Sequence, residues 1–363
     1  MKKICLIIIL FFIIITLTSC GKPSYKYYRY EYNGYLDTTG YIIVEYNQNK
    51  YTTKEVDDIL KNAKSVLLNV EKEFSISQTF YMQEEGIEKS TLMMINENSG
   101  KNLPTKVSDD FLDALKLAEK MYEYTDGLFD VTIGSLTTLW QISKKAEYCM
   151  NDFESLEYLC GIPSDEEIEK AKGLVDFKSV SVDYEEKTVS LEQVNMMLDF
   201  GAIGKGLAAE KLAEYLSEYD FPYVIINMGG NVKIIGMPST SIAPLKIYVN
   251  SPFNEGNVGY YHPKINTGGV TSGIYERYIY HEGIKYHHIL NPKTGYPCND
   301  ELVSVTIMGE NSSMSDALST SIFILGLEKG MELINSLDGY EAVFITKDEK
   351  IYVSNNLDFI EEK

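Results

Sequence analysis

The sequence predicts an α+β fold, a single compact domain of mixed or antiparallel sheets packed with helices. The chain has 363 residues, of which 44% are hydrophobic, so it can bury a substantial core. No strong linker or internal repeat divides it after residue 35. Segments with helical periodicity alternate with segments that have the two-residue alternation of strands. These features together favour one mixed domain.

The first 19 residues have the features of a lipoprotein signal peptide. Lys2 and Lys3 precede an apolar run over residues 4–17, which ends in small residues before Cys20. The run is shorter than the roughly 20 residues that a spanning helix needs. Leu-Thr-Ser-Cys resembles the bacterial lipobox, so we expect lipidation at Cys20, with a plain signal sequence as the alternative. Two acyl chains make a durable anchor, which predicts a protein held on the extracytoplasmic side of a bacterial cell membrane.

Residues 20–35 are expected to form a tether between the anchor and the domain, because this segment is short, Tyr-rich and of mixed charge. Residues 36–363 then make up the folded domain.

Two segments have the period of amphipathic helices. The first covers residues 53–74, where these apolar side chains recur at helical spacing: Val56, Ile59, Leu60, Ala63, Val66, Leu67 and Val70. The second covers residues 108–124, with Ser108 as the expected N-cap, acidic residues in the first turn and Gly127 just past the end.

Eight segments have the composition and alternation of strands. They are Tyr41–Tyr46, Ser179–Tyr184, Thr188–Leu191, Tyr223–Ile226, Val232–Ile235, Leu245–Val249, Leu302–Met308 and Glu341–Thr346.

Charge and cysteine content exclude some classes of partner. A net charge of -20 argues against nucleic acid, which needs a basic groove. After removal of the signal peptide and acylation of Cys20, the remaining cysteines are Cys149, Cys160 and Cys298, without metal-ligand spacing. A disulfide between Cys149 and Cys160 fits an oxidising compartment, and we expect all three to be structural.

A Gly-rich turn follows the second helix, over residues 125–134. Gly127 there can take a positive φ and lead the chain into an extended turn. Termination of the helix explains this segment equally simply.

A second Gly-rich turn, over residues 199–206, joins a strand end to a helix start. Free backbone N–H groups, the positive end of the helix dipole and Lys205 would suit an anion there. The glycine spacing matches neither a Walker A nor a Rossmann motif, so a tight packing turn is the alternative. The run Asn227-Met228-Gly229-Gly230-Asn231 is likewise either a hairpin or a close approach of backbone to ligand.

The last motifs are the run from Gly268 to Pro297 and the pair Asp316 and Thr320. If Ser315 caps a helix through Ile324, that pair lies at i and i+4 on one face, where both oxygens can reach one hard cation such as Mg²⁺. A capping Asp and a Thr bonded to the backbone would explain the pair without a metal. His287 and His288 are adjacent in a strand-like run, so only one of them can face a site.

These motifs occur in this order in one known family. The chain resembles the ApbE-type FAD:protein FMN transferases, once described as thiamine-biosynthesis lipoproteins. The resemblance runs from Asp37 to Thr320 and includes Gly-x-Phe-Asp, Asp-x-Gly-x-x-x-Lys-Gly, Thr-Ser-Gly-x-Tyr, His-x-x-x-Pro-x-Thr-Gly-x-Pro and Asp-x-x-x-Thr.

The resemblance implies a T-fold-related domain that binds FAD and Mg²⁺. A threonine hydroxyl of an acceptor protein, part of a membrane or extracellular electron-transfer system, would attack the phosphorus on the FMN side and expel AMP. Positioning and charge neutralisation would carry this chemistry. Carried over by matching position, Asp316, Thr320 and the Ala202 carbonyl would hold the metal. The FAD site would include Leu128, Phe129, Asp130, Asp199, Lys205 and the backbone near Leu290.

Three residues are expected to take part in catalysis: Lys205, His288 and Asn291. His288 would help to deprotonate the incoming hydroxyl. The family usually has an aspartate where this chain has Asn291, so a charge that could orient His288 or raise its basicity is missing. Two alternatives stay open: a Mg²⁺-dependent FAD pyrophosphatase that gives FMN and AMP, and a non-enzymatic FAD-binding lipoprotein.

Overall fold

The computed structural model describes residues 23–149, 160–240, 244–298 and 301–362. The expected signal peptide and Cys20 lie outside the described residues. No helix in the described ranges is long and apolar enough to cross a membrane.

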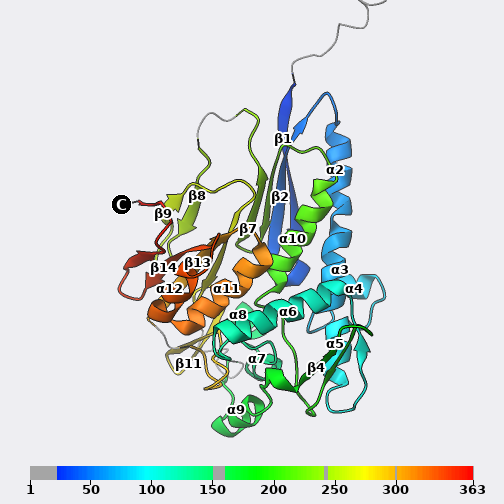
Figure 1. Cartoon of the computed structure of the whole chain (residues 1–363), viewed down its shortest axis with the longest axis vertical. Coiled ribbons are helices and arrows are strands. Elements are labelled where there is room, and N and C mark those ends of the chain that lie inside the picture. The colour runs from blue at the N-terminus through cyan, green and yellow to red at the C-terminus, as the bar shows by residue number, and fades with distance from the viewer. Residues whose placement is uncertain (1–22, 150–159, 241–243, 299–300, 363) are drawn as a thin grey trace, which may run out of the picture.

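An eight-stranded sheet forms the centre of the molecule (Figure 1). Every neighbouring pair in it is antiparallel. In spatial order the strands are β1 (Tyr25–Asn33), β2 (Thr39–Asn47), β6 (Tyr223–Met228), β7 (Asn231–Gly236), β10 (Gly268–Gly273), β13 (Leu302–Gly309), β14 (Glu341–Thr346) and β15 (Ile351–Val353).

Three small sheets surround it. They are β11 (Tyr278–His281) with β12 (Ile284–His287); β16 (Phe359–Glu361), β9 (Asn257–Tyr261) and β8 (Ile247–Asn250); and β3 (Thr105–Lys106), β5 (Thr188–Leu191) and β4 (Val180–Asp183). Residues of β8 and β9 pack on residues of β13 and β14 in a separate small core. Because α11 covers the other face of β13, all eight residues of that strand are buried.

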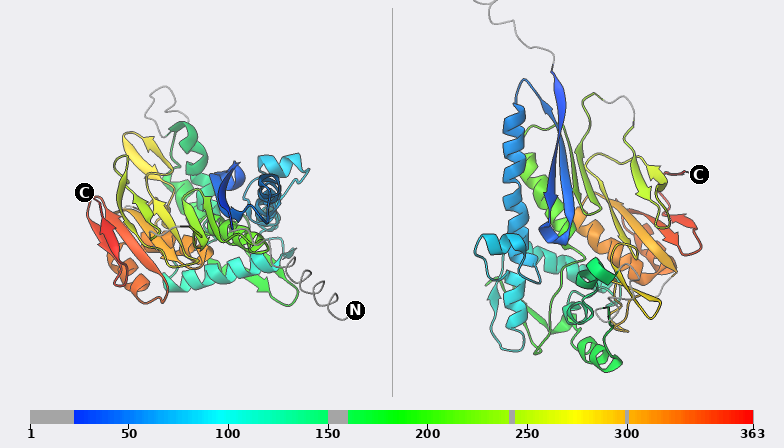
Figure 2. Two further views of the ribbon diagram at one scale, coloured as in Figure 1. Left: turned by 90° about the horizontal axis from the view of Figure 1, so that it is seen from above. Right: turned by 180° about the vertical axis from the view of Figure 1, so that it is seen from behind.

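Helices cover one face of the main sheet, and Figure 2 shows from behind how α2 (Thr53–Asn62) and α3 (Lys64–Phe74) run alongside β1 and β2. α10 (Gly204–Ser217) lies beside α3, and α11 (Ser312–Leu325) and then α12 (Leu327–Asn335) follow it across the sheet (Figure 1). The other helices are α4 (Phe80–Glu84), α5 (Thr91–Glu97), α6 (Asp109–Tyr124), α7 (Gly134–Trp140), α8 (Ile142–Cys149) and α9 (Asp165–Lys172), with short 3₁₀ turns η1 (Tyr35–Asp37) and η3 (Phe177–Ser179).

The α+β prediction is confirmed, and each expected strand is present with ends that shift by at most a few residues. Ser108 caps α6 through its hydroxyl, which accepts the Phe111 N–H, and Gly127 has a φ of +77°. The expected helix over residues 53–74 is two helices, which meet at Ala63. The predicted cap at Ser315 is wrong, because α11 begins three residues earlier and Asn311 caps it by accepting the Met314 N–H.

The tether prediction is wrong for residues 25–33, which form strand β1 at the edge of the main sheet. Alternation places Tyr32 against the helices, where it is 1% exposed and its hydroxyl donates to the Leu60 carbonyl (3.0 Å). The folded part of the chain therefore begins about ten residues earlier than expected.

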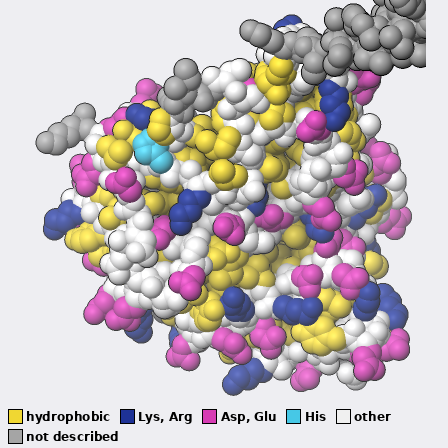
Figure 3. Space-filling model, turned by 45° about the horizontal axis from the view of Figure 1, so that its top comes forward, with side chains coloured by type: hydrophobic (Ala, Val, Ile, Leu, Met, Phe, Trp, Pro, Cys, Tyr) yellow, Lys and Arg dark blue, Asp and Glu magenta, His cyan; other side chains and the backbone are white. Residues whose placement is uncertain are grey.

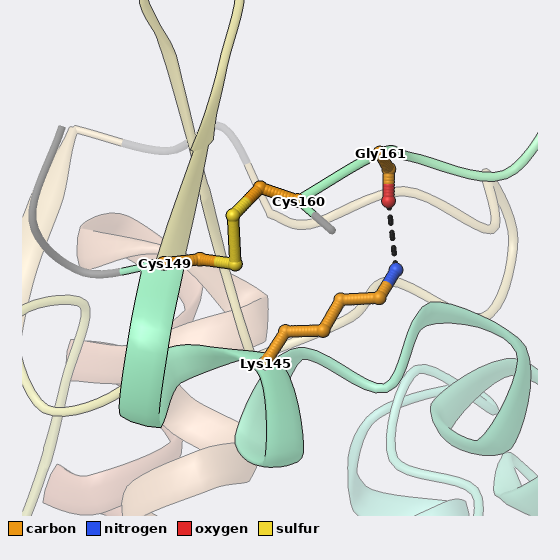
Figure 4. The surroundings of a disulfide bond; sticks show 4 residues. All are labelled: Lys145, Cys149, Cys160 and Gly161. Carbon is orange, nitrogen blue, oxygen red and sulfur yellow. Dashed lines mark hydrogen bonds between the residues drawn. A yellow bond between two sulfur atoms is a disulfide. The ribbon is translucent and has the colours of Figure 1, made fainter. Parts of the chain in front are cut away.

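The disulfide between Cys149 and Cys160 is present (Figure 4). Lys145, on the same helix as Cys149, donates to the Gly161 carbonyl (2.7 Å), so two bonds hold α8 to the segment that follows Cys160.

Helices α10 and α11 make their closest approach at Gly206. A β-carbon at this position would overlap the carbonyl oxygen of Ser312, in the first turn of α11. Glu210, one turn later in α10, accepts the Ser312 N–H and the Lys233 ammonium group (2.9 Å). Backbone contact and a buried ion pair thus fix the two helices against each other.

Gly206→Ala should destabilise the protein by about 1–3 kcal/mol, because a methyl group forces the two backbones apart. Gly204→Ala is the matched control, since a β-carbon at that first position of the same helix meets nothing within 4 Å. Thermal unfolding followed by circular dichroism measures both. Equal melting temperatures for the two variants would contradict this account of the helix pair.

Candidate functional site

The centre of the candidate site is the junction between the start of α10 and α11. Asp316 is 2% exposed, and its Oδ2 accepts the Gly206 N–H (2.9 Å). Its Oδ1 lies 3.6 Å from Lys205 Nζ. Burial raises the pKa of Asp316, whereas Lys205 and the Gly206 N–H favour the charged form. Lys205 and Asp316, which come from separate motifs of the sequence, are therefore neighbours in the structure.

Hydroxyl groups extend the site toward β10. Ser319 donates to the Asp316 carbonyl (2.8 Å), so the 2.7 Å contact between Ser272 Oγ and Ser319 Oγ is a bond that Ser272 donates. Ser272 Oγ also lies 3.4 Å from Thr320 Oγ1. Thr320 thus has a hydroxyl partner from the Thr-Ser-Gly motif, to which the sequence analysis gave no role.

The two histidines have different surroundings, as their adjacency in a strand-like run predicts. His287 is buried; its Nε2 bonds to the Cys298 carbonyl (2.6 Å) and its Nδ1 accepts the Ile289 N–H. Burial lowers the pKa of His287 to about 4, so it is a neutral core histidine.

His288 is half-buried, and its Nδ1 lies 3.1 Å from the Arg277 carbonyl oxygen. A carbonyl only accepts, so Nδ1 carries the proton and Nε2 keeps its lone pair. Burial, together with the neighbouring positive charges of Arg277 and Lys205, lowers the pKa of His288 to about 3. His288 is therefore a neutral ring with one nitrogen able to accept a proton.

Arg277 connects this histidine to the far side of the site. Its guanidinium group donates to the Asp37 carbonyl in η1 (2.9 Å), and the preceding Leu36 N–H bonds to the buried carboxylate of Glu71 in α3 (3.0 Å). The turn at η1 is thus held from both sides.

Glu276 was missed by the sequence analysis. Its carboxylate reaches solvent, yet enough protein surrounds it for burial to raise its pKa, while Lys205 and Arg277 oppose that rise and Asp316 adds to it. Two carboxylates therefore share the positive charge of Lys205. The available signal was its place directly after the Thr-Ser-Gly-x-Tyr motif, since the run holds a second acidic residue, Glu282.

Two predicted FAD residues have carboxylates that are engaged within the protein. Asp130 is 8% exposed, and its oxygens accept the Thr132 N–H (2.8 Å), the Thr132 hydroxyl (2.6 Å) and the Phe177 N–H (3.2 Å). Asp199 accepts the Thr137 hydroxyl (2.6 Å) and the Gly201 N–H (2.8 Å). Asp199 therefore shapes the turn into α10 and Asp130 shapes the turn after α6.

The other predicted FAD residues are largely covered. Phe129 and Leu290 are 3% and 4% exposed, and Leu128 packs partly buried against the core. Any contact that Phe129 or Leu290 makes with a ligand would have to use the backbone, so their roles stay predictions.

Asn291 forms a turn, and its side-chain hydrogen bonds within the described residues go to the backbone of that turn and not to His288. Its Oδ1 accepts the Lys293 N–H (2.9 Å), and its carbonyl accepts the Gly295 N–H (2.8 Å). This side-chain turn is common for Asn and Asp before a tight corner. The geometry gives Asn291 a structural role, whereas the carbonyl of Arg277 orients His288.

Comparison with known proteins places the chain in a family. A model described as the ApbE family matches residues 38–344. The chain belongs to the ApbE family. A FAD:protein FMN transferase of Klebsiella pneumoniae (strain 342) is 32% identical to it over 268 residues, which are 74% of this chain and 78% of that relative. One from Treponema pallidum (strain Nichols) is 29% identical over 283 residues, 73% of each.

Solved structures of ApbE proteins have the same fold. The flavin transferase ApbE from Vibrio cholerae superposes with a TM-score of 0.75 at 23% identity and covers 92% of this chain and 98% of its own. The ApbE protein of Thermotoga maritima gives a TM-score of 0.74 at 28% identity and covers 91% and 97%.

The residues at this site of the ApbE-family chain fit a Mg²⁺ ion that takes only some of its ligands from the protein and the others from a substrate and water. The described ranges contain no group of three or more His, Cys, Asp or Glu placed to hold a metal. Asp316 is a buried carboxylate with only a distant cation at Oδ1, and Thr320 adds a neutral oxygen on the same helix face. Mg²⁺ takes few protein oxygens and completes its shell with water and phosphate. Ala202 lies in the turn before α10, and its part as a ligand stays a prediction.

Asn291→Asp should leave kcat nearly unchanged, because a carboxylate oxygen can accept the Lys293 and Thr294 N–H groups that Asn291 Oδ1 accepts, and His288 has another partner. Asn291→Ala removes that acceptor and should cost about 1 kcal/mol of stability. Steady-state kinetics and thermal melts test both variants. A large rise in kcat for Asn291→Asp would show that the missing charge limits catalysis after all.

Proposed function

We propose that the chain transfers the FMN half of FAD to a threonine hydroxyl of an acceptor protein and releases AMP, in a Mg²⁺-dependent reaction. The observation that carries this proposal is the junction at α10, where Lys205, a helix N-terminus and the buried Asp316 meet. A metal-bound diphosphate requires a helix N-terminus that binds its oxygens and, beside it, a carboxylate that binds the metal. The names of the relatives support the transfer of FMN from FAD to a protein.

The start of α10 is the binding element for the diphosphate. Its first N–H groups and the helix dipole favour negative charge, and Lys205 adds a full positive charge. Gly206 allows α10 to lie close enough to α11 for its N–H to orient Asp316.

Asp316, Thr320 and the Ala202 carbonyl would hold Mg²⁺, and the ion when bound would neutralise the non-bridging oxygens of the diphosphate. Ser272 keeps the Thr320 hydroxyl on the β10 side. When the substrate is bound, the Lys205 ammonium group would contact the diphosphate in place of Asp316, because the diphosphate carries more negative charge.

His288 would accept the proton of the incoming threonine at Nε2. The bond from threonine oxygen to the FMN phosphorus forms, the bond from that phosphorus to the bridging oxygen breaks, and AMP leaves with that oxygen. A positioned base contributes about 10² to 10⁴ in rate. Negative charge from bound substrate would raise the low pKa of this histidine toward a useful range.

We place the reaction outside the cytoplasm, with the chain anchored through acylated Cys20 and the acceptor in a membrane or extracellular electron-transfer system. The lipobox supports this location, and so does the disulfide between Cys149 and Cys160, because disulfides persist in oxidising compartments.

Incubation of the purified chain with FAD, Mg²⁺ and a threonine-bearing acceptor should give flavin fluorescence on the acceptor band in a denaturing gel and one AMP for each flavin. Asp316→Asn should abolish Mg²⁺-dependent turnover. Asp126→Asn is the matched control, since that carboxylate is fully exposed. Release of free FMN with AMP would replace transfer by hydrolysis, intact FAD would indicate storage, and an active Asp316→Asn variant would remove the metal assignment.

The low pKa of His288 predicts that kcat/KM for FAD has no acid limb near pH 6.5, because the free enzyme keeps this ring neutral far below that pH. His288→Asn should lower kcat by about 10² to 10⁴. His262→Asn, at an exposed histidine whose Nδ1 also contacts a backbone carbonyl, should not. A pH profile with a midpoint near 6.5 that disappears in His288→Asn would contradict the assignment.

A further inference from the structure

A groove of about 500 Å³ lies on the face of the main sheet opposite α2 and α10. Cross-strand register explains its floor: Arg29 pairs with Ile43 and Ile43 with Ile225, so the three side chains share one face. The residues between them, such as Ile42 and Val44, belong to the helix-covered core. The floor is therefore formed by alternate residues of three strands, and Pro238 and Leu245 of the β7–β8 connection also line the groove.

The groove combines apolar walls with polar groups that lack strong internal partners. Tyr223 lines it, and its buried hydroxyl has no hydrogen-bond partner within the described ranges. Arg29 is half exposed, lies 3.8 Å from the centre of the Tyr41 ring, and pairs with the exposed Glu31. Exposed pairs of this kind are weak. The buried Glu45 lies between Tyr27 and Tyr223 in the strand register, and its carboxylate accepts the Ser239 N–H (2.8 Å).

These groups match the boundary layer of a membrane. Tyrosine side chains place a ring in an apolar region and a hydroxyl in a polar one, and arginine binds phosphate. Tyr27, which also lines the groove, is 52% exposed although it lies in a strand. Figure 3 tips this end of the molecule forward and shows hydrophobic side chains gathered there.

The length of chain before β1 identifies the partner. Tyr25, the first residue of β1, follows Cys20 by five positions, so an anchor at Cys20 holds that strand within about 18 Å of its lipid. Tyr27 and Arg29 follow at about 7 and 14 Å along the strand. The groove is thus the part of the folded domain that an anchored chain keeps nearest to the bilayer.

Charge favours the same orientation. The chain carries a net charge of -20, and a surface of anionic lipids would repel most of it. Lys26 and Lys50 lie at the end of the sheet where β1 begins, because Lys26 pairs with Tyr46 and Lys50 follows the end of β2. Lys50 pairs with Asp220, and Arg29, further along β1, pairs with Glu31, so this end is close to neutral and a negative surface repels it less than the rest of the molecule.

We propose that the groove forms a membrane-docking surface and takes the glycerophosphate region of a phospholipid. The proposal rests on the anchor at Cys20 and is independent of the flavin chemistry. It fixes which end of the domain faces the bilayer, which a lipid tail alone would leave free.

Fluorescence quenching by brominated lipids tests this orientation in the full lipidated chain, reconstituted in vesicles of phosphatidylethanolamine and phosphatidylglycerol. Tyr27→Trp reports on the groove. Tyr184→Trp is the matched control, because Tyr184 is 47% exposed and lies at the turn after β4, at the other end of the molecule (Figure 1). The native Trp140 is wholly buried and contributes the same background to both.

We expect brominated lipid to remove the emission that Tyr27→Trp adds and to leave the emission that Tyr184→Trp adds. Addition of Arg29→Glu should restore the Tyr27→Trp signal, whereas Lys116→Glu, at an exposed lysine beside Tyr184, should not. Equal quenching of both reporters, or quenching of neither, overturns the docking surface. Mass spectrometry that finds no acyl chains on Cys20 overturns it through its anchor, and FMN transfer in the same samples reports separately on the proposed function.

Discussion

The close contact of α10 with α11 at Gly206 is the constraint on which the site depends. Only the absence of a side chain there lets the backbone of one helix touch the other, and that approach places a peptide N–H against Asp316. Glu210 and Lys233 hold the same pair of helices one turn away. An anion-binding helix end and a buried carboxylate, which would otherwise be separate features, become neighbours. The proposed binding of Mg²⁺ with the diphosphate would depend on that proximity.

Local patterns predicted the fold well wherever burial follows a simple period. The strand at residues 188–191 and the cap at Ser108 depend on neighbours within a few residues, and both are present. Residues 25–33 were assigned to a tether because an edge strand shows one face to water and has the composition of a linker. Its true partner, β2, and the carbonyl that holds Tyr32 come from other parts of the chain. The break at Ala63 was hidden because the apolar spacing continues across it.

For the site, the motifs named residues that the structure brings close together, but not the bonds that those residues make. Lys205 and Asp316 are neighbours, since each has a fixed place on its own helix. The carboxylate of Asp130 and the amide of Asn291 serve turns instead, because a short polar side chain beside a Gly or Pro corner bonds to its own backbone. Ser272 and Glu276 acquire their significance only when β10 and the following segment are brought against α11 and α10, and one-dimensional sequence carries no record of that contact.

The pairing of β1 with β2 also sets the distance between the end of the domain where β1 begins and the candidate site. Nine residues of antiparallel strand measure about 30 Å, and the turn that Arg277 grips follows β1 at its far end. A domain standing on the end where β1 begins would hold its reactive pocket about that far above the lipid headgroups. The strand pair would then act as a ruler, and threonines on acceptor segments that project to this level would be reached in preference to those lying at the bilayer itself.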